Sequence, residues 1–426
     1  MIRFYNGVLL AMADGCAVTR DEVWTDGDRI TYVGPERVDA PPFEREIDLR
    51  GDLLMPGFKD AHTHSAMTFL RSYADDLPLQ SWLFDKVFPL EEKLTPEAIY
   101  AFTKLAILEY LSNGITASFD MYFHLDDYVS ANLESGFRTV ICAVAGSSST
   151  PDFKTIEENY GRFNSMGPLV GYRLGFHAEY TSKPEVLRDL AALARQYKAP
   201  VWTHISETKS EVEGCRERHG GMTPAEYFDS LGLYDFGGGG YHCVWFTERD
   251  IEIFRRRGLW AVSCPASNAK LASGIAPLTE LMDAGVGLAL GTDGAASNNA
   301  LDMFREMYLA CVLQKLRRSD AAACGADRIL EAATVGGARA MGLTDCDCIA
   351  PGKAADMIVI DMSRPNMQPE HNIAKNLVYS GSGANVRLTM IGGRVLYENG
   401  EYHIGEDAQR ICERAAARTK EIVESV

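Results

Sequence analysis

Residues 55–64 read MPGFKDAHTH, a short strand-like run that ends in two histidines. Seven later segments have a similar form, and helical patterns separate them. Strand–helix units repeated at this spacing indicate a parallel sheet, and eight of them predict a closed (β/α)8 barrel of the TIM type, an α/β fold. The expected strands cover residues 55–64, 114–122, 137–146, 169–179, 199–207, 239–246, 258–267 and 285–294.

The helical pattern over residues 95–114 has clear start and stop signals. Thr95 can cap the helix, Pro96 takes its first position, and Asn113-Gly114 ends it. Residues 183–200 and 247–258 carry comparable signals. The alternative fold is an open doubly wound sheet, but no phosphate-binding Gly-x-Gly-x-x-Gly motif follows a strand.

The two ends of the chain differ from the middle, because they consist of short strands and turns. Residues 29–35 alternate and end at Gly-Pro, while Gly392-Gly393 and Asn399-Gly400 are turn dipeptides. We therefore expect both ends to build one small β domain beside the barrel. The expected division is residues 1–56 and 349–426 for that domain and residues 57–348 for the barrel.

Composition is that of an ordinary globular protein. The chain has 426 residues, and 59 acidic side chains outnumber 42 basic ones for a net charge of -17. This charge argues against a nucleic-acid partner, and the absence of a run of about 18 apolar residues argues against a membrane partner. Ten scattered cysteines indicate reduced thiols, and the N-terminus is too polar for a secretory signal. We expect a cytoplasmic protein that acts on a small molecule, with homo-oligomer formation left open.

Histidine and aspartate gather at the carboxyl ends of the expected strands. That end of a (β/α)8 barrel holds the active site. Side chains two apart on a strand point the same way, so the histidine pair of the first strand can bind one metal ion. The strand-end residues are His62, His64, His177, His204, His242 and Asp293, in a chain with nine histidines.

Three of these strands can supply a complete metal site. His204 and Asp293 join His62 and His64 in a three-histidine, one-carboxylate set suited to Zn²⁺ or Fe²⁺, with water in the open position. The metal would lower the pKa of that water and make it a nucleophile. Asp293 could accept its proton.

Two more residues complete the expected catalytic chemistry. His242 can hydrogen-bond the oxyanion that forms. Glu207, three residues after His204, can carry a proton to the leaving group or to a ring nitrogen. The other interpretation of Glu207 is a surface carboxylate in the charged stretch SETKSEVE, which is our expectation for Glu211 and Glu213.

Several longer motifs carry a family resemblance that runs from end to end of the chain. They are PGFKDAHTHSAMTFLRSYADDLPLQSWL, GITASFDMYF, THISETKSEVE, HCVW, CPASNAKLASGIAP, LGTDGAASNNALDMFREM and GKAADMIVID. Together they resemble the amidohydrolase superfamily in its cytosine deaminase/chlorohydrolase-like branch, and within it the 5'-methylthioadenosine/S-adenosylhomocysteine deaminases.

The resemblance implies one divalent metal ion on the four ligands named above, with zinc expected and iron as the alternative. It implies that metal-bound hydroxide adds at C6 of an adenine nucleoside and that ammonia leaves. Glu207 would deliver a proton to the ring, and His242 would orient the hydroxide. The two chain ends would form a composite β-sandwich.

The resemblance also implies substrate contacts. Trp82 is expected as an apolar wall, Glu91 as an acceptor for ribose hydroxyls, and His177 as a contact near base and sugar. Plain core packing and a solvated carboxylate are the alternatives for Trp82 and Glu91. Asn268 either orients the substrate or caps a turn.

Two departures from the family bear on the substrate. Residues 140–155 contain no arginine, and Lys154 is their first cation, so S-adenosylhomocysteine is less favoured than adenosine, 5'-deoxyadenosine or 5'-methylthioadenosine. Glu179 stands where the family usually has proline. It either faces a cationic or hydroxyl-rich substrate group or lies solvated in a loop.

Other functions stay open from sequence alone. The same metal chemistry could act on guanine, a pterin, a cytosine-like base or an s-triazine, where chloride could be the leaving group. A binuclear hydantoinase-type enzyme needs a bridging lysine at the end of the fourth strand, where this chain has His177. A barrel without catalysis would not need Glu207 and His242.

Overall fold

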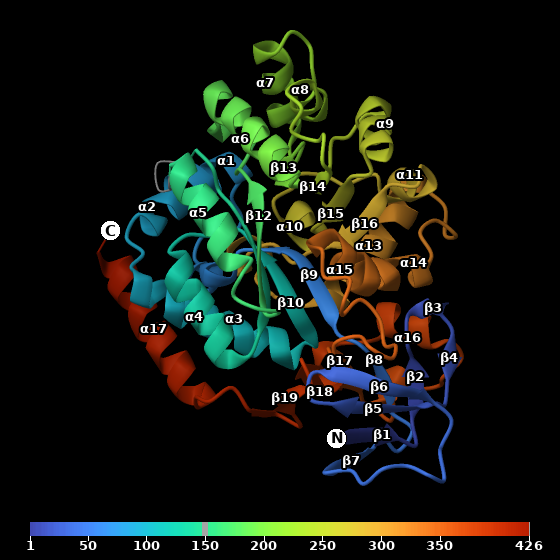
Figure 1. Cartoon of the computed structure of the whole chain (residues 1–426). Helices are drawn as coiled ribbons and strands as arrows, with labels where there is room; N and C mark the ends of the chain where they lie inside the picture. The colour runs from blue at the N-terminus through green and yellow to red at the C-terminus, as the bar shows by residue number, and fades with distance from the viewer. Residues whose placement is uncertain (147–151, 426) are drawn as a thin grey trace.

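The computed structural model describes residues 1–146 and 152–425. Eight parallel strands lie in one sheet in sequential order, from β9 to β16 (Figure 1). The prediction of a (β/α)8 barrel is confirmed. The barrel strands are β9 (Phe58–Thr63), β10 (Ile115–Asp120), β11 (Arg138–Cys142), β12 (Val170–Gly175), β13 (Val201–Ile205), β14 (Gly238–His242), β15 (Trp260–Ser263) and β16 (Gly287–Leu290).

Hydrogen bonds beyond the regular strand pairs join β16 to β9. The N–H of Asp293 donates to the carbonyl of His62 at 2.9 Å. The Asp60 carboxylate accepts from the N–H and the hydroxyl of Thr292, at 2.8 and 2.5 Å. Gly291 permits this approach, because a Cβ there would lie 2.6 Å from the His62 carbonyl oxygen. This seam places two of the predicted metal ligands side by side.

Helices connect the strands and cover the outside of the barrel (Figure 1). The Thr95 hydroxyl accepts from the N–H of Ala98 at the start of α3, as the capping signal predicts. The helix α9 ends on Gly258, whose φ of 63° is left-handed. The main helices are α3 (Pro96–Ser112), α4 (Leu125–Ser135), α5 (Phe153–Phe163), α6 (Pro184–Tyr197), α7 (Lys209–Arg218), α8 (Pro224–Ser230), α9 (Glu248–Arg257), α10 (Pro265–Lys270), α11 (Leu278–Asp283), α12 (Ala295–Asn298), α13 (Met303–Arg318), α14 (Ala326–Glu331) and α15 (Gly337–Met341).

Aromatic rings fill the barrel below the strand ends. Trp202 of β13 and Tyr241 of β14 stack with ring centroids 5.8 Å apart. The ring of His62 stacks on Tyr241 at 3.8 Å. All three side chains are buried. This stack of rings fixes the plane of the His62 imidazole at the carboxyl end of β9.

The two ends of the chain meet in two further sheets (Figure 1). Their strand orders are β6-β5-β1-β7 and β20-β19-β18-β17-β8-β2-β4. Strand β8 pairs with the C-terminal β17, and one buried apolar cluster contains residues from both ends. The strands are β1 (Ile2–Tyr5), β2 (Val8–Leu10), β4 (Val18–Thr19), β5 (Glu22–Asp26), β6 (Arg29–Gly34), β7 (Arg45–Asp48), β8 (Leu53–Pro56), β17 (Met357–Ile360), β18 (Val386–Ile391), β19 (Arg394–Glu398) and β20 (Glu401–Tyr402).

The C-terminal segment also contributes helices to the barrel side. Helix α16 (Ile373–Tyr379) packs against α14, and α17 (Ala408–Glu424) runs along α3 to the C-terminus (Figure 1). Residues 349–426 thus contain strands of the terminal sheets and two helices that pack on barrel helices, and the division of the chain into domains stays a prediction. Within the described residues, no helix is long and apolar enough to span a bilayer.

A buried ion pair connects the barrel to the terminal sheets. Arg138 at the start of β11 donates from Nε and Nη2 to the two carboxylate oxygens of Asp356, at 2.7 and 2.9 Å. Both side chains are buried. Asp356 directly precedes β17, so this pair fixes the base of the barrel against the β domain.

Candidate metal centre and substrate pocket

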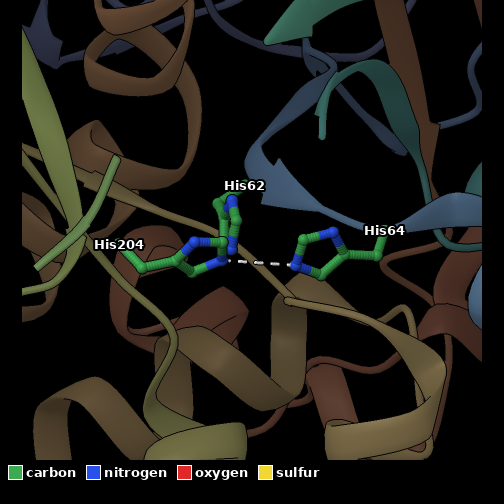
Figure 2. A group of neighbouring side chains, drawn as sticks. All are labelled: His62, His64 and His204. Carbon is green, nitrogen blue, oxygen red and sulfur yellow. Dashed lines mark hydrogen bonds between the residues drawn. The ribbon is translucent and has the colours of Figure 1, made fainter. Parts of the chain in front are cut away.

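The four predicted metal ligands converge where β9, β13 and β16 end. Figure 2 shows the rings of His62, His64 and His204 gathered around one space, and their ligand nitrogens lie within 4.8 Å of one another. The Nε2 atoms of His64 and His204 are 3.4 Å apart. The Oδ1 atom of Asp293 is 3.6 Å from Nε2 of His62 and 3.4 Å from Nε2 of His64. This spacing suits ligands of a single ion.

The hydrogen bonds of the three histidines fit a divalent metal. Both ring nitrogens of His62 are buried and have no hydrogen-bond partner among the described residues, a costly state unless they bind something. The Nδ1 atoms of His64 and His204 bond to the carbonyls of Met121 and His177, both at 2.7 Å, which leaves their Nε2 atoms able to bind a metal ion. Burial lowers the pKa of His62 and of His204 and keeps both in the neutral, metal-binding form.

Asp293 is held ionised and in place by its neighbours. Its Oδ2 accepts from the hydroxyls of Ser267 and Ser297, at 2.6 and 2.8 Å. Burial opposes its charge, but the imidazoles of His242 and His64 and the two hydroxyls outweigh burial and lower its pKa. Its Oδ1 accepts from the N–H of Gly294 at 2.9 Å and also faces the histidines, where the carboxylate could bind a metal ion.

Glu207 and His242 face each other beside these ligands. The Oε2 atom of Glu207 is 3.8 Å from Nε2 of His242, and its Oε1 is buried without a partner in the described chain. Burial raises the pKa of Glu207. Burial opposes the charge of His242, but Glu207 and Asp293 outweigh it and raise its pKa. The two side chains are thus suited to hold and move a proton.

The pocket in front of the four ligands has a volume of about 660 Å³, including its open mouth. The structure brings Trp82, Glu91 and His177 to its wall. Trp82 comes from the short helix α1 (Leu79–Trp82) and Glu91 from α2 (Phe88–Glu91). Burial raises the pKa of Glu91 to about 7, and the Tyr122 hydroxyl donates to its Oε1 at 2.7 Å. Tyr122 and Tyr180 line the pocket too; Tyr122 lies in the motif GITASFDMYF, but the sequence did not single out either tyrosine as a pocket residue.

Two predicted substrate contacts lie elsewhere. Glu179 is buried and does not line the pocket, because its carboxylate accepts from the Arg218 guanidinium and lies 2.8 Å from Nε2 of His219. Glu179 is therefore not a solvated loop residue, and its carboxylate binds other side chains of the protein away from the pocket wall. Asn268 neither lines the pocket nor only caps a turn; its Oδ1 accepts from Nδ1 of His242 at 2.8 Å.

The segment 140–155, whose lack of arginine disfavours S-adenosylhomocysteine, is described only in part. Residues 147–151 lie outside the described residues. Among the residues that are described, no arginine or lysine lines the pocket. The described pocket wall therefore offers no cation for the carboxylate of an amino-acid tail.

Glu211 is a residue whose place the sequence did not reveal. The prediction of a surface carboxylate is wrong, because Glu211 is only 4% exposed. Its two oxygens accept from the backbone N–H groups of Ser206 and Glu207, at 2.7 and 2.8 Å. Glu213, two residues on, is exposed as expected.

Comparisons with known proteins agree with this geometry. Residues 53–396 match the amidohydrolase family. A 5-methylthioadenosine/S-adenosylhomocysteine deaminase of Pelotomaculum thermopropionicum is 39% identical, over 99% of each chain. A 5'-deoxyadenosine deaminase of Methanopyrus kandleri is 36% identical, over 98% of this chain and all of that one. The crystal structure of an adenosine deaminase from Xanthomonas campestris with bound zinc has a TM-score of 0.94 at 33% identity, over 100% of this chain and 99% of that one.

Proposed function

This chain belongs to the amidohydrolase family, and we propose that it is a metal-dependent hydrolase that removes the 6-amino group of an adenine nucleoside as ammonia. The proposed substrates are adenosine, 5'-deoxyadenosine and 5'-methylthioadenosine. The named activities of the relatives in Pelotomaculum and Methanopyrus support this substrate class. The reaction consumes one water and leaves a 6-oxopurine nucleoside.

The proposed cofactor is one zinc ion, held by His62, His64, His204 and Asp293. Nitrogen-rich sets with one carboxylate suit zinc, and the Xanthomonas relative contains it. When bound, the ion supplies Lewis-acid activation of water near neutral pH.

The observation that carries the proposal is the position of Glu207. Its carboxyl is buried, has a raised pKa and a free oxygen, and lines the same pocket as His64, His204 and Asp293. Glu207 passes its proton to the ring nitrogen next to C6, which makes C6 a better electrophile for water. It then regains a proton from the oxygen added at C6, so that the product is the lactam.

His242 and Asp293 handle the other charges of the reaction. His242, whose pKa is raised, donates a hydrogen bond from Nε2 to the oxygen that adds at C6. Asp293 accepts a proton from the attacking water and returns it to the amino group, which leaves as ammonia. Water therefore supplies both the oxygen of the product and the third hydrogen of ammonia.

The walls of the pocket support a nucleoside with a small or apolar 5' group. Leu79, Trp82 and Phe88 offer apolar surface, and the carboxylate of Glu91 can accept from ribose hydroxyls. The described lining contains no arginine or lysine, which disfavours the zwitterionic tail of S-adenosylhomocysteine.

The test is a substrate panel with the zinc-loaded protein. The panel contains the three proposed nucleosides, S-adenosylhomocysteine, guanine, a pterin, cytosine and an s-triazine. Ammonia release and the ultraviolet change of the purine ring are measured for each. We expect the highest kcat/KM with one of the three nucleosides. Reaction of another ring without reaction of any adenine nucleoside would overturn the proposal.

A further inference from the structure

We propose that Glu211 is a positioning residue for Glu207. Its buried carboxylate binds the backbone N–H groups of Ser206 and Glu207 and thereby fixes how the Glu207 side chain enters the pocket. The inference rests on the proposed function, because that function gives Glu207 its proton-transfer role.

The turn that carries Glu207 has an unusual backbone. Ser206 directly follows β13 and has a φ of 51°, a left-handed conformation that costs free energy in a residue with a side chain. Neighbouring groups must therefore hold it. The Glu211 oxygens accept from the N–H of Ser206 and of Glu207, at 2.7 and 2.8 Å. On the other side, the N–H of Trp245 donates to the carbonyl of Ser206 at 2.8 Å.

Helix α7 explains why Glu211 can reach this turn. Thr208 caps the helix, and its hydroxyl accepts from the N–H of Glu211 at 3.2 Å. Glu211 is the third residue of the helix, so its side chain folds back over the N-terminus toward the preceding turn. The carboxylate thus joins the end of β13 to the start of α7, with the residue proposed for catalysis between them.

The energetics favour an effect on catalysis over an effect on substrate binding. Hydrogen bonds from backbone N–H groups to a carboxylate are strong, and their loss would leave buried donors unpaired. Glu211 does not line the pocket and has no contact with a bound nucleoside to lose. Release of the turn would instead displace Glu207, and a misplacement of about 1 Å can lower a rate about 100-fold.

The first test removes the Glu211 clamp, by which we mean the two hydrogen bonds from the N–H groups of Ser206 and Glu207 to the Glu211 carboxylate. It compares this variant with a variant of an exposed glutamate on the same helix. Glu211→Gln keeps the shape of the side chain but turns one acceptor into a donor that faces an N–H. Glu213→Gln is the matched control, because Glu213 is exposed on the same helix and pairs only with Lys209 in the described chain, at 3.4 Å. We expect kcat to fall about 10- to 100-fold in Glu211→Gln, with KM and zinc content unchanged. Unchanged kcat, or equal losses in the two variants, would overturn the proposal.

A double-mutant cycle separates positioning from a general structural role. If Glu211 acts through Glu207, then adding Glu211→Gln to Glu207→Gln causes no further loss of kcat. A loss that multiplies in the double variant would show that Glu211 acts by another route. The cycle uses whichever ring the wild-type protein hydrolyses, so a wrong substrate class would not leave the clamp untested.

Amide hydrogen exchange provides a readout without turnover. The clamp predicts that the peptide containing Ser206 and Glu207 exchanges faster in Glu211→Gln than in wild type, while Glu213→Gln behaves as wild type. Equal protection in all three proteins would refute the clamp whatever the substrate is. Failure of the nucleoside assay alone would refute only the proposed function.

Discussion

The imidazole of His242 donates from Nδ1 to the amide oxygen of Asn268, 2.8 Å away, and so turns its Nε2 toward Glu207. Both side chains are buried, and the amide nitrogen of Asn268 has no partner among the described residues. The amide therefore serves to orient the imidazole.

Replacement of Asn268 by leucine should lower kcat. The change removes the acceptor for Nδ1 of His242, a hydrogen bond of about 1.5–3 kcal/mol when one partner is charged. We expect kcat to fall about 10-fold or more with KM little changed. Asn268→Asp keeps an acceptor and should retain most of the activity in the same steady-state assay. Equal loss in the two variants would contradict this role.

Removal of the hydroxyls that bond to Asp293 should weaken metal binding. Ser267→Ala and Ser297→Ala together delete both hydrogen bonds to its Oδ2. Loss of such partners of a ligand typically costs about 10- to 100-fold in metal affinity. Competition with a chelating dye measures the affinity, and added zinc should restore much of the activity. An unchanged affinity would show that Asp293 needs no support.

The pH dependence of nucleoside hydrolysis should reflect the ionisation of the Glu91 carboxyl. Burial raises the pKa of this carboxyl to about 7, and in the proposed ribose contact only the ionised form could accept from both hydroxyls. The ionised fraction grows as the pH rises, so kcat/KM should increase through about pH 7. In Glu91→Gln this rise should vanish and KM should be high at every pH. A rise that persists in the variant would assign it to another group.

Loss of the Arg138 guanidinium should destabilise the protein and change its response to acid. Arg138→Met leaves the buried Asp356 carboxylate without its partner, which costs about 3–5 kcal/mol of unfolding free energy. Urea titration measures this loss, and the double variant Arg138→Met/Asp356→Leu should recover part of it. Full persistence of the loss in the double variant would contradict an origin in the unpaired charge.

The sign of the acid effect follows from Asp356. Burial opposes its charge, yet Arg138 outweighs burial and lowers its pKa below the unfolded value. The pair therefore stabilises the fold at pH values above the unfolded pKa of aspartate, and this contribution is lost as the pH falls through the lower, folded pKa. Wild type should lose unfolding free energy in that acid range more steeply than Arg138→Met.

Local patterns explain why the barrel, and the meeting of the four proposed metal ligands at one end of it, could be predicted. Most strands are short runs between helical stretches, and the proposed ligands stand at or just after strand ends, where the fold brings them together. His62 and His64 show their shared direction by a spacing of two residues. His204 could be added because it stands at the end of another strand, β13.

Contacts between residues far apart in the chain could not be predicted in this way. Glu179 pairs with Arg218, 39 residues later, and nothing near either residue indicates the partner. Glu211 lies in a charged stretch typical of a solvated helix, because a carboxylate that binds backbone N–H groups has no sequence pattern of its own. Asn268, on helix α10, likewise bonds to a side chain from a different element, His242 of β14.

The closure of the barrel has a consequence for the lifetime of the protein. His62 and Asp293 lie on opposite sides of the seam between β9 and β16, joined by the bond from the Asp293 N–H to the His62 carbonyl. An ion held by both side chains would cross-link the first and last strands. A ligand that binds only the folded state raises the stability of that state. In a cell short of the ion, the barrel would then open locally more often at this edge and be degraded faster by proteases. Metal scarcity would therefore reduce the amount of enzyme as well as its activity.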